Sequence, residues 1–138
     1  MGILIDASVF IEAERGRLAL SAKTKGREEE FFLSVITASE LLYGVYRAGN
    51  AAVRARRSAF VEAILDQIPI IPIDLATARA HAQLRASLDS KGIPIGPYDS
   101  WLAAACIAHG HTLVTANIKE FGKVPGLIVE NWIAAGST

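Results

Sequence analysis

The sequence predicts an α/β fold in which a central parallel sheet of about five strands is flanked by helices. Short apolar runs that suit buried strands alternate with longer stretches of helical periodicity along the 138 residues. Strands that alternate with helices imply right-handed crossovers and a parallel sheet covered on both faces. The length supports one hydrophobic core, and no repeat, low-complexity tract or linker interrupts it, so we expect a single domain over residues 1–138.

The first elements are a strand, a helix, a charged loop and a second strand. Gly2–Ile5 is a short apolar run that ends at Asp6, and Ala7–Glu14 is predicted to follow it as a helix. The charged stretch Lys23–Glu30 is predicted to be a loop that runs into a solvent-facing helix. Phe31–Val35 is apolar again and is predicted to form the second strand.

Two helices and a third strand are expected next. Thr37 and Glu40 are spaced as the N-cap and N3 residues of a capping box, which predicts a helix that begins there and continues through Tyr46. Ala51–Gln67 carries apolar residues at helical spacing with arginines on the other face, which predicts another helix. Ile70–Ile73 is predicted to be the third strand.

The last third of the chain continues the alternation. Asp74 can cap a helix from Leu75 to about Ser90, for which Gly92 is a natural stop. The remaining elements are a loop, a helix ended by Gly110, a fourth strand, a turn or short helix, and a fifth strand. They are expected, in that order, at Ile93–Pro97, Trp101–His109, Thr112–Thr115, Asn117–Phe121 and Leu127–Val129.

Five polar side chains fall near the carboxyl ends of the predicted strands: Asp6, Glu40, Asp99, Asn117 and Glu120. Ligands of open parallel sheets bind at this rim, where the strand order reverses. Each residue taken alone has a simpler explanation: a helix cap, a capping box, a charge on a helix dipole, a turn residue or a solvated surface charge. Their joint placement favours a shared function.

Close carboxylates repel one another and raise each other's pKa. A hard divalent cation such as Mg²⁺ removes that cost, because it prefers one or two carboxylates together with waters and substrate phosphate. The histidines and Cys106 are not spaced as zinc ligands. A magnesium or manganese site is therefore the expected use of these acids.

The composition limits the possible environments and partners. The formal net charge is zero, which argues mildly against a nucleic-acid binder unless cations neutralise the acidic site. One cysteine excludes an internal disulfide, and no apolar run approaches the length of a membrane span, so a cytoplasmic protein is expected. Basic residues that could hold an RNA backbone form two groups: Arg47, Arg54, Arg56 and Arg57, and Lys119 and Lys123.

At these residues the chain resembles the PIN-domain family, and within it the VapC-type toxins of bacterial toxin–antitoxin modules. The resemblance covers nearly the whole chain, and the order and spacing of its pieces make it specific. The matching pieces are ILIDAS at 3–8, SELLYG at 39–44, YDSWLAA at 98–104, LVTAN at 113–117 with EF at 120–121, VPGL at 124–127 and ENW at 130–132.

The resemblance implies a Rossmann-like sheet and a metal-dependent endoribonuclease with one or two Mg²⁺ or Mn²⁺ ions. Its first three acids correspond to Asp6, Glu40 and Asp99 as metal ligands. Asn117 stands where a fourth acid is often found, so Glu120 is expected to supply that charge as catalytic residue and ligand. Asn117 itself is also expected to be a catalytic residue. Thr115 is expected to support the site through its hydroxyl.

The resemblance also implies partners: an RNA substrate, with tRNA as one candidate, a second copy of the chain in a homodimer, and a cognate VapB-like antitoxin that blocks the site. Apolar faces in 38–48 and 53–65 offer a groove for an amphipathic antitoxin helix. Three alternatives remain open. They are a catalytically silent PIN-like RNA-binding or interaction module, a receiver-type signalling domain, and a nuclease of the same fold directed at DNA or at flap structures.

Overall fold

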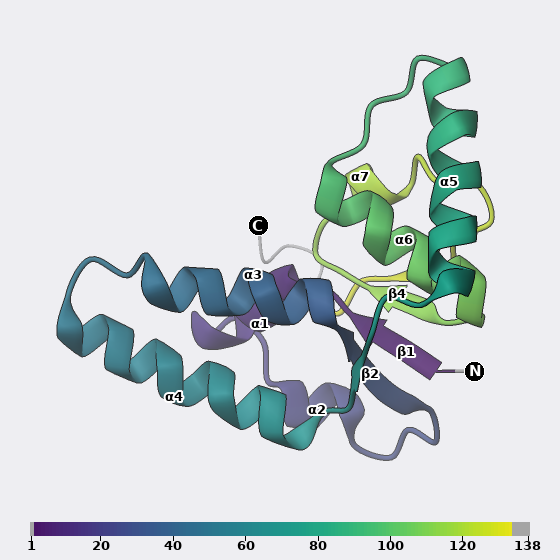
Figure 1. Cartoon of the computed structure of the whole chain (residues 1–138). Coiled ribbons are helices and arrows are strands. Elements are labelled where there is room, and N and C mark those ends of the chain that lie inside the picture. The colour runs from purple at the N-terminus through teal and green to yellow at the C-terminus, as the bar shows by residue number, and fades with distance from the viewer. Residues whose placement is uncertain (1, 134–138) are drawn as a thin grey trace.

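The computed structural model describes residues 2–133, which build one five-stranded sheet with the order β3-β2-β1-β4-β5 (Figure 1). Every neighbouring pair of strands is parallel, so the predicted α/β fold with a parallel sheet is confirmed. The strands are β1 (Gly2–Ile5), β2 (Glu30–Ser34), β3 (Ile70–Ile71), β4 (Thr112–Val114) and β5 (Val129–Glu130). The helices are α1 (Ala7–Glu14), α2 (Leu20–Thr24), α3 (Val35–Tyr46), α4 (Ala51–Gln67), α5 (Leu75–Ser90), α6 (Pro97–His109) and α7 (Ile118–Phe121).

The strand order reverses beside β1. The chain passes from β1 to β2 and β3 on one side, and then returns to place β4 and β5 on the other side. The carboxyl ends of β1 and β4 therefore border the crevice in which an open parallel sheet binds its ligands.

Two groups of buried side chains form the core. One includes Leu4, Leu88 and Leu102 and joins the sheet to α5 and α6, which pack against each other. The other includes Ile5 and Phe10 and joins the sheet to α1, α3 and α4. Alternate residues of β1 thus point into opposite layers, as the pleat of a strand covered on both faces requires.

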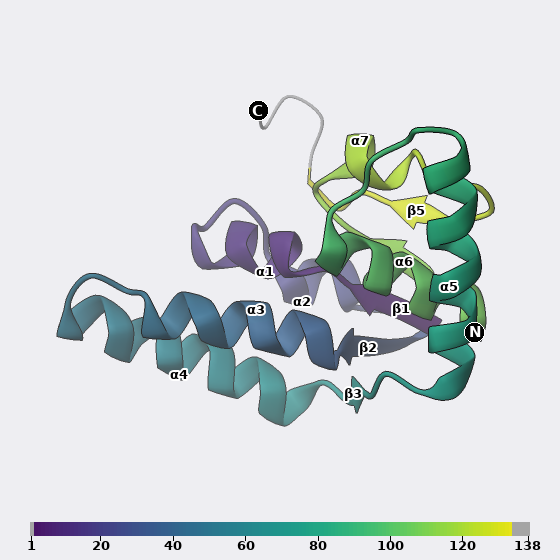
Figure 2. The ribbon, with the colours of Figure 1, turned by 45° about the horizontal axis from the view of Figure 1, so that its top comes forward.

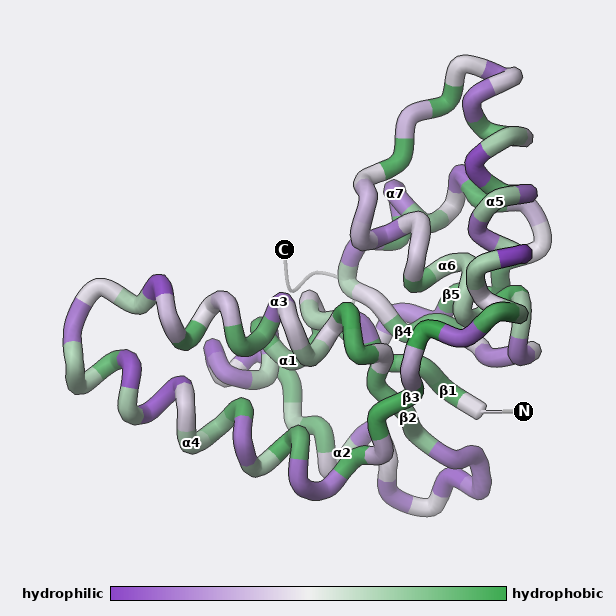
Figure 3. Tube along the Cα trace, viewed as in Figure 1, coloured by the Kyte–Doolittle hydropathy of each residue, from purple (hydrophilic) through white to green (hydrophobic). Residues whose placement is uncertain are grey.

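The helices α3 and α4 lie side by side and extend past the edge of the sheet (Figure 2). Coloured by hydropathy, the strands are largely hydrophobic, whereas α4 carries a succession of hydrophilic residues along its length (Figure 3). Arg56 and Arg57 of α4 are among these hydrophilic residues, and they line a groove that is described below. Within the described part of the chain, no helix is both long and apolar enough to cross a membrane.

The capping box predicted at Thr37 and Glu40 is wrong. Helix α3 begins at Val35, and Ser34 is its N-cap, because the Ser34 hydroxyl accepts a hydrogen bond from the amide of Ile36 at 3.1 Å. β2 therefore leads into α3 with no intervening loop. Thr37 is fully buried inside the helix, and Glu40 lies in the second turn rather than the first.

Two other helix boundaries differ from the prediction. Helix α6 begins at Pro97, four residues before the expected start at Trp101, because proline suits the first turn of a helix, where no amide donor is needed. The loop expected over Lys23–Glu30 is confirmed only at residues 25–29, because Lys23 and Thr24 belong to α2 and Glu30 begins β2. The helix α2 precedes this loop, where a helix was expected to follow it. The predicted strand Ile70–Ile73 is shortened to β3, since Pro72 cannot donate to the sheet.

The other helices agree closely with the prediction. The bounds of α1, α4 and α5 are those expected, and Asp74 caps α5 by accepting a hydrogen bond from the Thr77 amide at 2.8 Å. Gly110 ends α6 in the left-handed conformation, with φ of 70°, which glycine adopts without strain.

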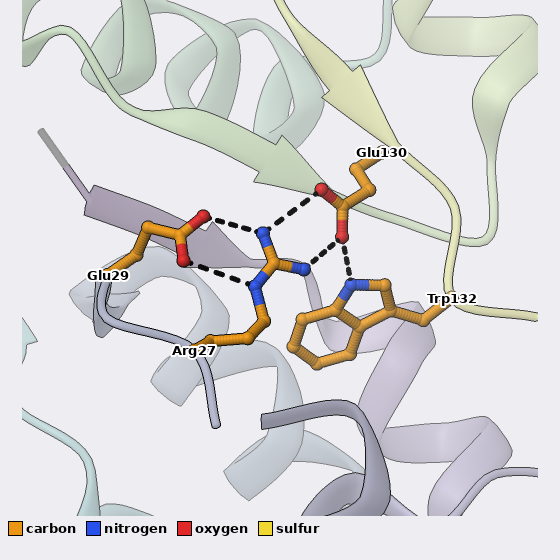
Figure 4. Close-up of polar contacts among 4 residues, drawn as sticks. All are labelled: Arg27, Glu29, Glu130 and Trp132. Atoms are coloured by element: carbon orange, nitrogen blue, oxygen red, sulfur yellow. Dashed lines mark hydrogen bonds and ion pairs between the residues drawn. The ribbon is translucent and has the colours of Figure 1, made fainter. Parts of the chain in front are cut away.

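An ion cluster ties the loop before β2 to the end of β5 (Figure 4). The Arg27 guanidinium contacts Glu29 at 2.7 Å and Glu130 at 2.6 Å, and it lowers the pKa of the Glu130 carboxyl. The Trp132 indole donates to the same Glu130 carboxylate and packs edge-on against Phe31. The cluster fastens the last strand to the layer that contains α1 and α2.

Candidate active site

The site is built around Asp6, directly after β1. Its amide donates to the carbonyl of Val114 at 2.9 Å, so the backbone pairing of β1 with β4 continues one step beyond the strand. The Asp6 side chain is buried, and its Oδ2 accepts hydrogen bonds from the Ser8 hydroxyl at 2.7 Å and the Thr115 hydroxyl at 2.8 Å. These two donors fix the orientation of the buried Asp6 carboxylate.

The same two hydroxyls also hold the chain after β4. Ser8 Oγ accepts from the amide of Ala116 at 3.0 Å, and Thr115 Oγ1 accepts from the amide of Asn117 at 2.9 Å. Thr115 therefore supports the site through its hydroxyl, as the sequence suggested. The network locks the ends of β1 and β4 together at the rim where the acids were expected.

Glu40 reaches this rim from the second turn of α3. Its Oε1 is buried and has no hydrogen-bond partner among the described residues. Burial, followed by the negative charges of Asp6 and Asp99, raises the pKa of the Glu40 carboxyl to about 7. An acceptor without a donor at such a position leaves a place for a cation or a proton.

Asp99 enters the site from the first turn of α6. It lies over Gly96, because a Cβ on that glycine would come within 3.3 Å of Asp99 Oδ2. Burial raises the pKa of the Asp99 carboxyl to about 6, with further contributions from the charges of Asp6 and Glu120, while Lys123 opposes the rise. The structure thus brings Asp6, Glu40 and Asp99 near enough to repel one another.

Glu120 lies at the edge of this group and is already engaged. Its Oε1 accepts from the Gly96 amide at 3.2 Å, and its Oε2 accepts from Lys123 Nζ at 3.0 Å. Both bonds lower the pKa of the Glu120 carboxyl, with the Lys123 contact the larger cause. Lys123 also donates to the carbonyl of Pro94 at 3.3 Å, so the pair braces the loop that carries Gly96 and leads to Asp99.

Asn117 is present at the rim through its backbone. It is the N-cap of α7, but its side chain makes no capping hydrogen bond and is exposed. Its predicted catalytic role is neither supported nor opposed by a contact in the described part of the chain.

Three residues that hold the site were not singled out from the sequence as parts of it: Ser8, Gly96 and Lys123. Ser8 has a local signal, since a serine two positions after a strand-ending aspartate can reach that carboxylate. Lys123 was expected among the residues that hold RNA, and its spacing of three residues from Glu120 is a local signal for their ion pair. Gly96 has no such signal, because its contact depends on how the α5–α6 loop packs against α7.

The acids suit an open metal site better than a closed one. Among residues 2–133, no three Asp, Glu, His or Cys side chains form a ready-made coordination shell. Mg²⁺ does not require one, because it retains waters and binds through one or two carboxylates. The unpartnered Oε1 of Glu40 and the mutual repulsion of Glu40 and Asp99 are what a hard divalent cation relieves.

A groove of about 540 Å³ between α1, α3 and α4 begins at Glu40. Apolar side chains, including Phe10, Phe60 and Val61, form its floor, and four arginines stand along it. We refer to it as the α1–α3–α4 groove. It lies where the sequence predicted a groove between the apolar faces of two helices.

Comparison with known proteins places this fold and site in context. Residues 3–127 match the family model described as PIN domain. The chain is 35% identical over 129 residues to Ribonuclease VapC1 of Rickettsia felis, covering 94% of this chain and 95% of the relative. It is 36% identical over 100 residues to the tRNA(fMet)-specific endonuclease VapC of Salmonella typhimurium, covering 72% of this chain and 74% of that protein. Its fold is similar to VapBC2 from Rickettsia felis, solved bound to a DNA fragment from their promoter, with a TM-score of 0.85, 28% identity and coverage of 96% of this chain and 99% of that chain.

Proposed function

Because the chain belongs to the PIN-domain family, and within it to the VapC-type toxin ribonucleases of VapBC toxin–antitoxin systems, we propose that it hydrolyses RNA phosphodiester bonds at the Asp6, Glu40 and Asp99 site. The observation that carries the proposal is the buried, unpartnered Oε1 of Glu40, whose carboxyl has its pKa raised by burial and then by the charges of Asp6 and Asp99. Such crowding destabilises a fold that has no use for it.

Asp6 and Asp99 are the principal ligands in this proposal, and Glu40 binds the ion directly or through a water. A bound Mg²⁺ or Mn²⁺ supplies a water of lowered pKa and a positive charge on the phosphate that is attacked. Ser8 and Thr115 hold the Asp6 carboxylate in one orientation. The N-terminus of α6 adds a partial positive charge close to Asp99.

Glu120 completes the acidic group in the proposal, because its charge acts on Asp99. Because both carboxylate oxygens of Glu120 already accept hydrogen bonds, we assign it to the edge of the site, where it positions the α5–α6 loop. It joins the metal ligands only if it gives up its contact with Lys123. Asn117 has a neutral, exposed side chain, and we assign it a contact with substrate or water at the entrance to the acidic site.

The substrate proposed is a structured RNA, and tRNA is the first one to test, because a similar protein is named a tRNA(fMet)-specific endonuclease. Phosphate contacts do not read sequence. The site residues therefore support the reaction and leave the choice of target to other surfaces.

The partner proposed is an antitoxin whose apolar helix covers the floor of the α1–α3–α4 groove next to Glu40. The floor is apolar and Glu40 lines the same groove, so a helix seated there also covers Glu40. We further propose a homodimer, for which exposed apolar side chains such as Leu75 and Ile128 are candidate contacts. Light scattering of the purified chain measures its mass in solution.

A nuclease assay on antitoxin-free protein tests the proposed function. We expect cleavage of tRNA with Mg²⁺ or Mn²⁺, loss of cleavage with a chelator, and loss in Asp6→Asn and Asp99→Asn. The matched control is Asp89→Asn, an exposed carboxylate on α5 that should leave cleavage unchanged. Cleavage that a chelator leaves untouched contradicts the mechanism, binding without cleavage supports a silent module, and a preference for DNA supports the third alternative.

A further inference from the structure

The four arginines that line the α1–α3–α4 groove differ in what they already contact. Arg57 is occupied, since its Nε lies 3.3 Å from Glu14 and its guanidinium donates to the carbonyl of Gly44 at 3.1 Å. Arg15 has a weak ion pair, at 4.0 Å from Glu12. Arg47 and Arg56 have no carboxylate partner among residues 2–133.

Arg54, a fifth arginine near the groove, has a structural role. Arg54 lies outside the groove and donates to the carbonyl of Ala48 at 3.0 Å, which closes the turn between α3 and α4. Arg47, at the C-cap of α3, and Arg56, on α4, therefore line the groove with no carboxylate or carbonyl partner among residues 2–133.

An aromatic ring accompanies them. Tyr43 is 64% exposed, and the guanidinium of Arg47 lies 5.6 Å from the centre of its ring. The Tyr43 ring and the Arg47 guanidinium contact each other, and both remain exposed to solvent. Grooves that combine basic residues with exposed aromatic rings are typical of single-stranded nucleic-acid binding, in which phosphates meet the cations and bases stack on the rings.

The groove also reaches one residue of the acidic site, Glu40. Glu40 lines its inner end, and Tyr43 and Arg47 follow on the same helix at spacings of three and four residues. These three side chains therefore lie along one face of α3. An RNA strand that follows this face of α3 passes from Arg47 to Glu40.

Resting on the proposed function, we propose that Arg47 and Arg56 bind backbone phosphates of the RNA next to the scissile bond, with Tyr43 offering a face on which a base stacks. Charge complementarity favours RNA for this mouth of the groove, because every nucleotide carries a phosphate, whereas the apolar floor suits the antitoxin helix. An antitoxin on the floor then inhibits in two ways, by covering Glu40 and by covering the path of the RNA.

The test is the salt dependence of binding to a fluorescein-labelled single-stranded RNA oligonucleotide, measured by anisotropy in EDTA so that the RNA stays intact. Each phosphate contact contributes about 0.7 to the slope of log K against log salt. Arg47→Ala/Arg56→Ala should therefore lower the magnitude of the slope by about 1.4 between ~50 and ~200 mM KCl. Arg47→Lys/Arg56→Lys should keep most of it, since it keeps both charges.

The matched control is Arg79→Ala/Arg85→Ala on α5, which removes the same net charge away from the groove. It should leave the slope unchanged. If the slope falls equally in the Arg47/Arg56 and the Arg79/Arg85 double variants, it reports net charge only and the proposal is overturned. An unchanged slope in the Arg47/Arg56 double variant, called the groove pair below, overturns it as well. If the groove pair binds RNA normally but no longer co-purifies with a small partner protein, the mouth belongs to the antitoxin and the proposal is wrong.

Turnover in Mg²⁺ separates this inference from the proposed function. The groove pair should raise KM and leave kcat within about twofold, because the arginines bind substrate without touching the reacting atoms. A wild-type protein that cleaves no RNA contradicts the proposed function. If the wild-type protein cleaves RNA and the Arg47/Arg56 double variant has the same KM and the same salt slope, only the inference is contradicted.

Discussion

Replacing Glu40 by glutamine is expected to stabilise the metal-free protein at alkaline pH and to abolish RNA cleavage. The Glu40 carboxyl is half-buried, lacks a donor at Oε1, and lies in the field of Asp6 and Asp99. Its pKa is about 7 in the folded protein against 4.5 as the ordinary value. Because the folded protein holds this proton more tightly than the unfolded chain, stability falls as the pH rises from about 4.5 to about 7.

The size of the effect follows from the same pKa. At about 1.4 kcal/mol for each pKa unit, the rise to about 7 corresponds to an upper limit of ~3 kcal/mol. Solvent reaches part of the carboxyl and screens it, so we expect Glu40→Gln to gain about 1–2 kcal/mol in the free energy of unfolding at about pH 8. At about pH 4 the wild-type side chain is already protonated, and the two proteins should be nearly equal.

The assay is urea denaturation in EDTA at both pH values, with the nuclease assay on the same preparations. Glu62→Gln on α4 is the control, because it removes an exposed carboxylate outside the site. A variant that is no more stable than wild type at about pH 8, or whose gain is the same at both pH values, would refute the claim that the carboxylates crowd one another.

Three further perturbations test separate parts of the structure. Thr115→Val removes the donor to Asp6 and the acceptor of a buried amide, so a loss of about 2–4 kcal/mol in unfolding free energy is expected, while Thr115→Ser should lose no more than about 1 kcal/mol. Asn50→Ala removes the side chain that caps α4 through the Val53 amide and should cost about 1 kcal/mol by urea denaturation, with kcat unchanged. Lys123→Met removes the contact with Glu120 and should lower kcat, with only a small fall in the melting temperature. Lys123→Arg should restore kcat. An equal loss of kcat in both variants would show that this contact does not position the site.

The helices of this protein could be predicted from local signals where those signals act alone. Asp74 had no competitor as the cap of α5, and the glycine at 110 had no alternative as the end of α6. Thr37 had a competitor: Ser34 lies at the end of β2 and captures the first free amide, so the helix starts before the capping box can form. Local capping rules allow either Ser34 or Thr37 as the N-cap, and the position at which β2 ends decides that it is Ser34.

The acids of the site could be predicted because parallel strands bring their carboxyl ends to one rim. What the sequence cannot supply is the pairing across that rim. The hydrogen bond from Thr115 to Asp6 depends on the register in which Ile5 lies opposite Val114, whereas the one from Ser8 is local. The engagement of Glu120 depends on the packing of a loop 24 residues away in sequence. Such contacts come from tertiary structure, which no local pattern encodes.

Manganese binding to the antitoxin-free protein tests most directly whether the carboxylates converge to hold a divalent ion. Electron paramagnetic resonance of free Mn²⁺ during a titration at neutral pH counts the ions bound per chain. We expect one or two ions on the wild-type protein and a loss of this binding in Asp6→Asn/Asp99→Asn, with Asp89→Asn unchanged. Equal binding by the wild-type protein and the double variant would contradict the assignment of the site.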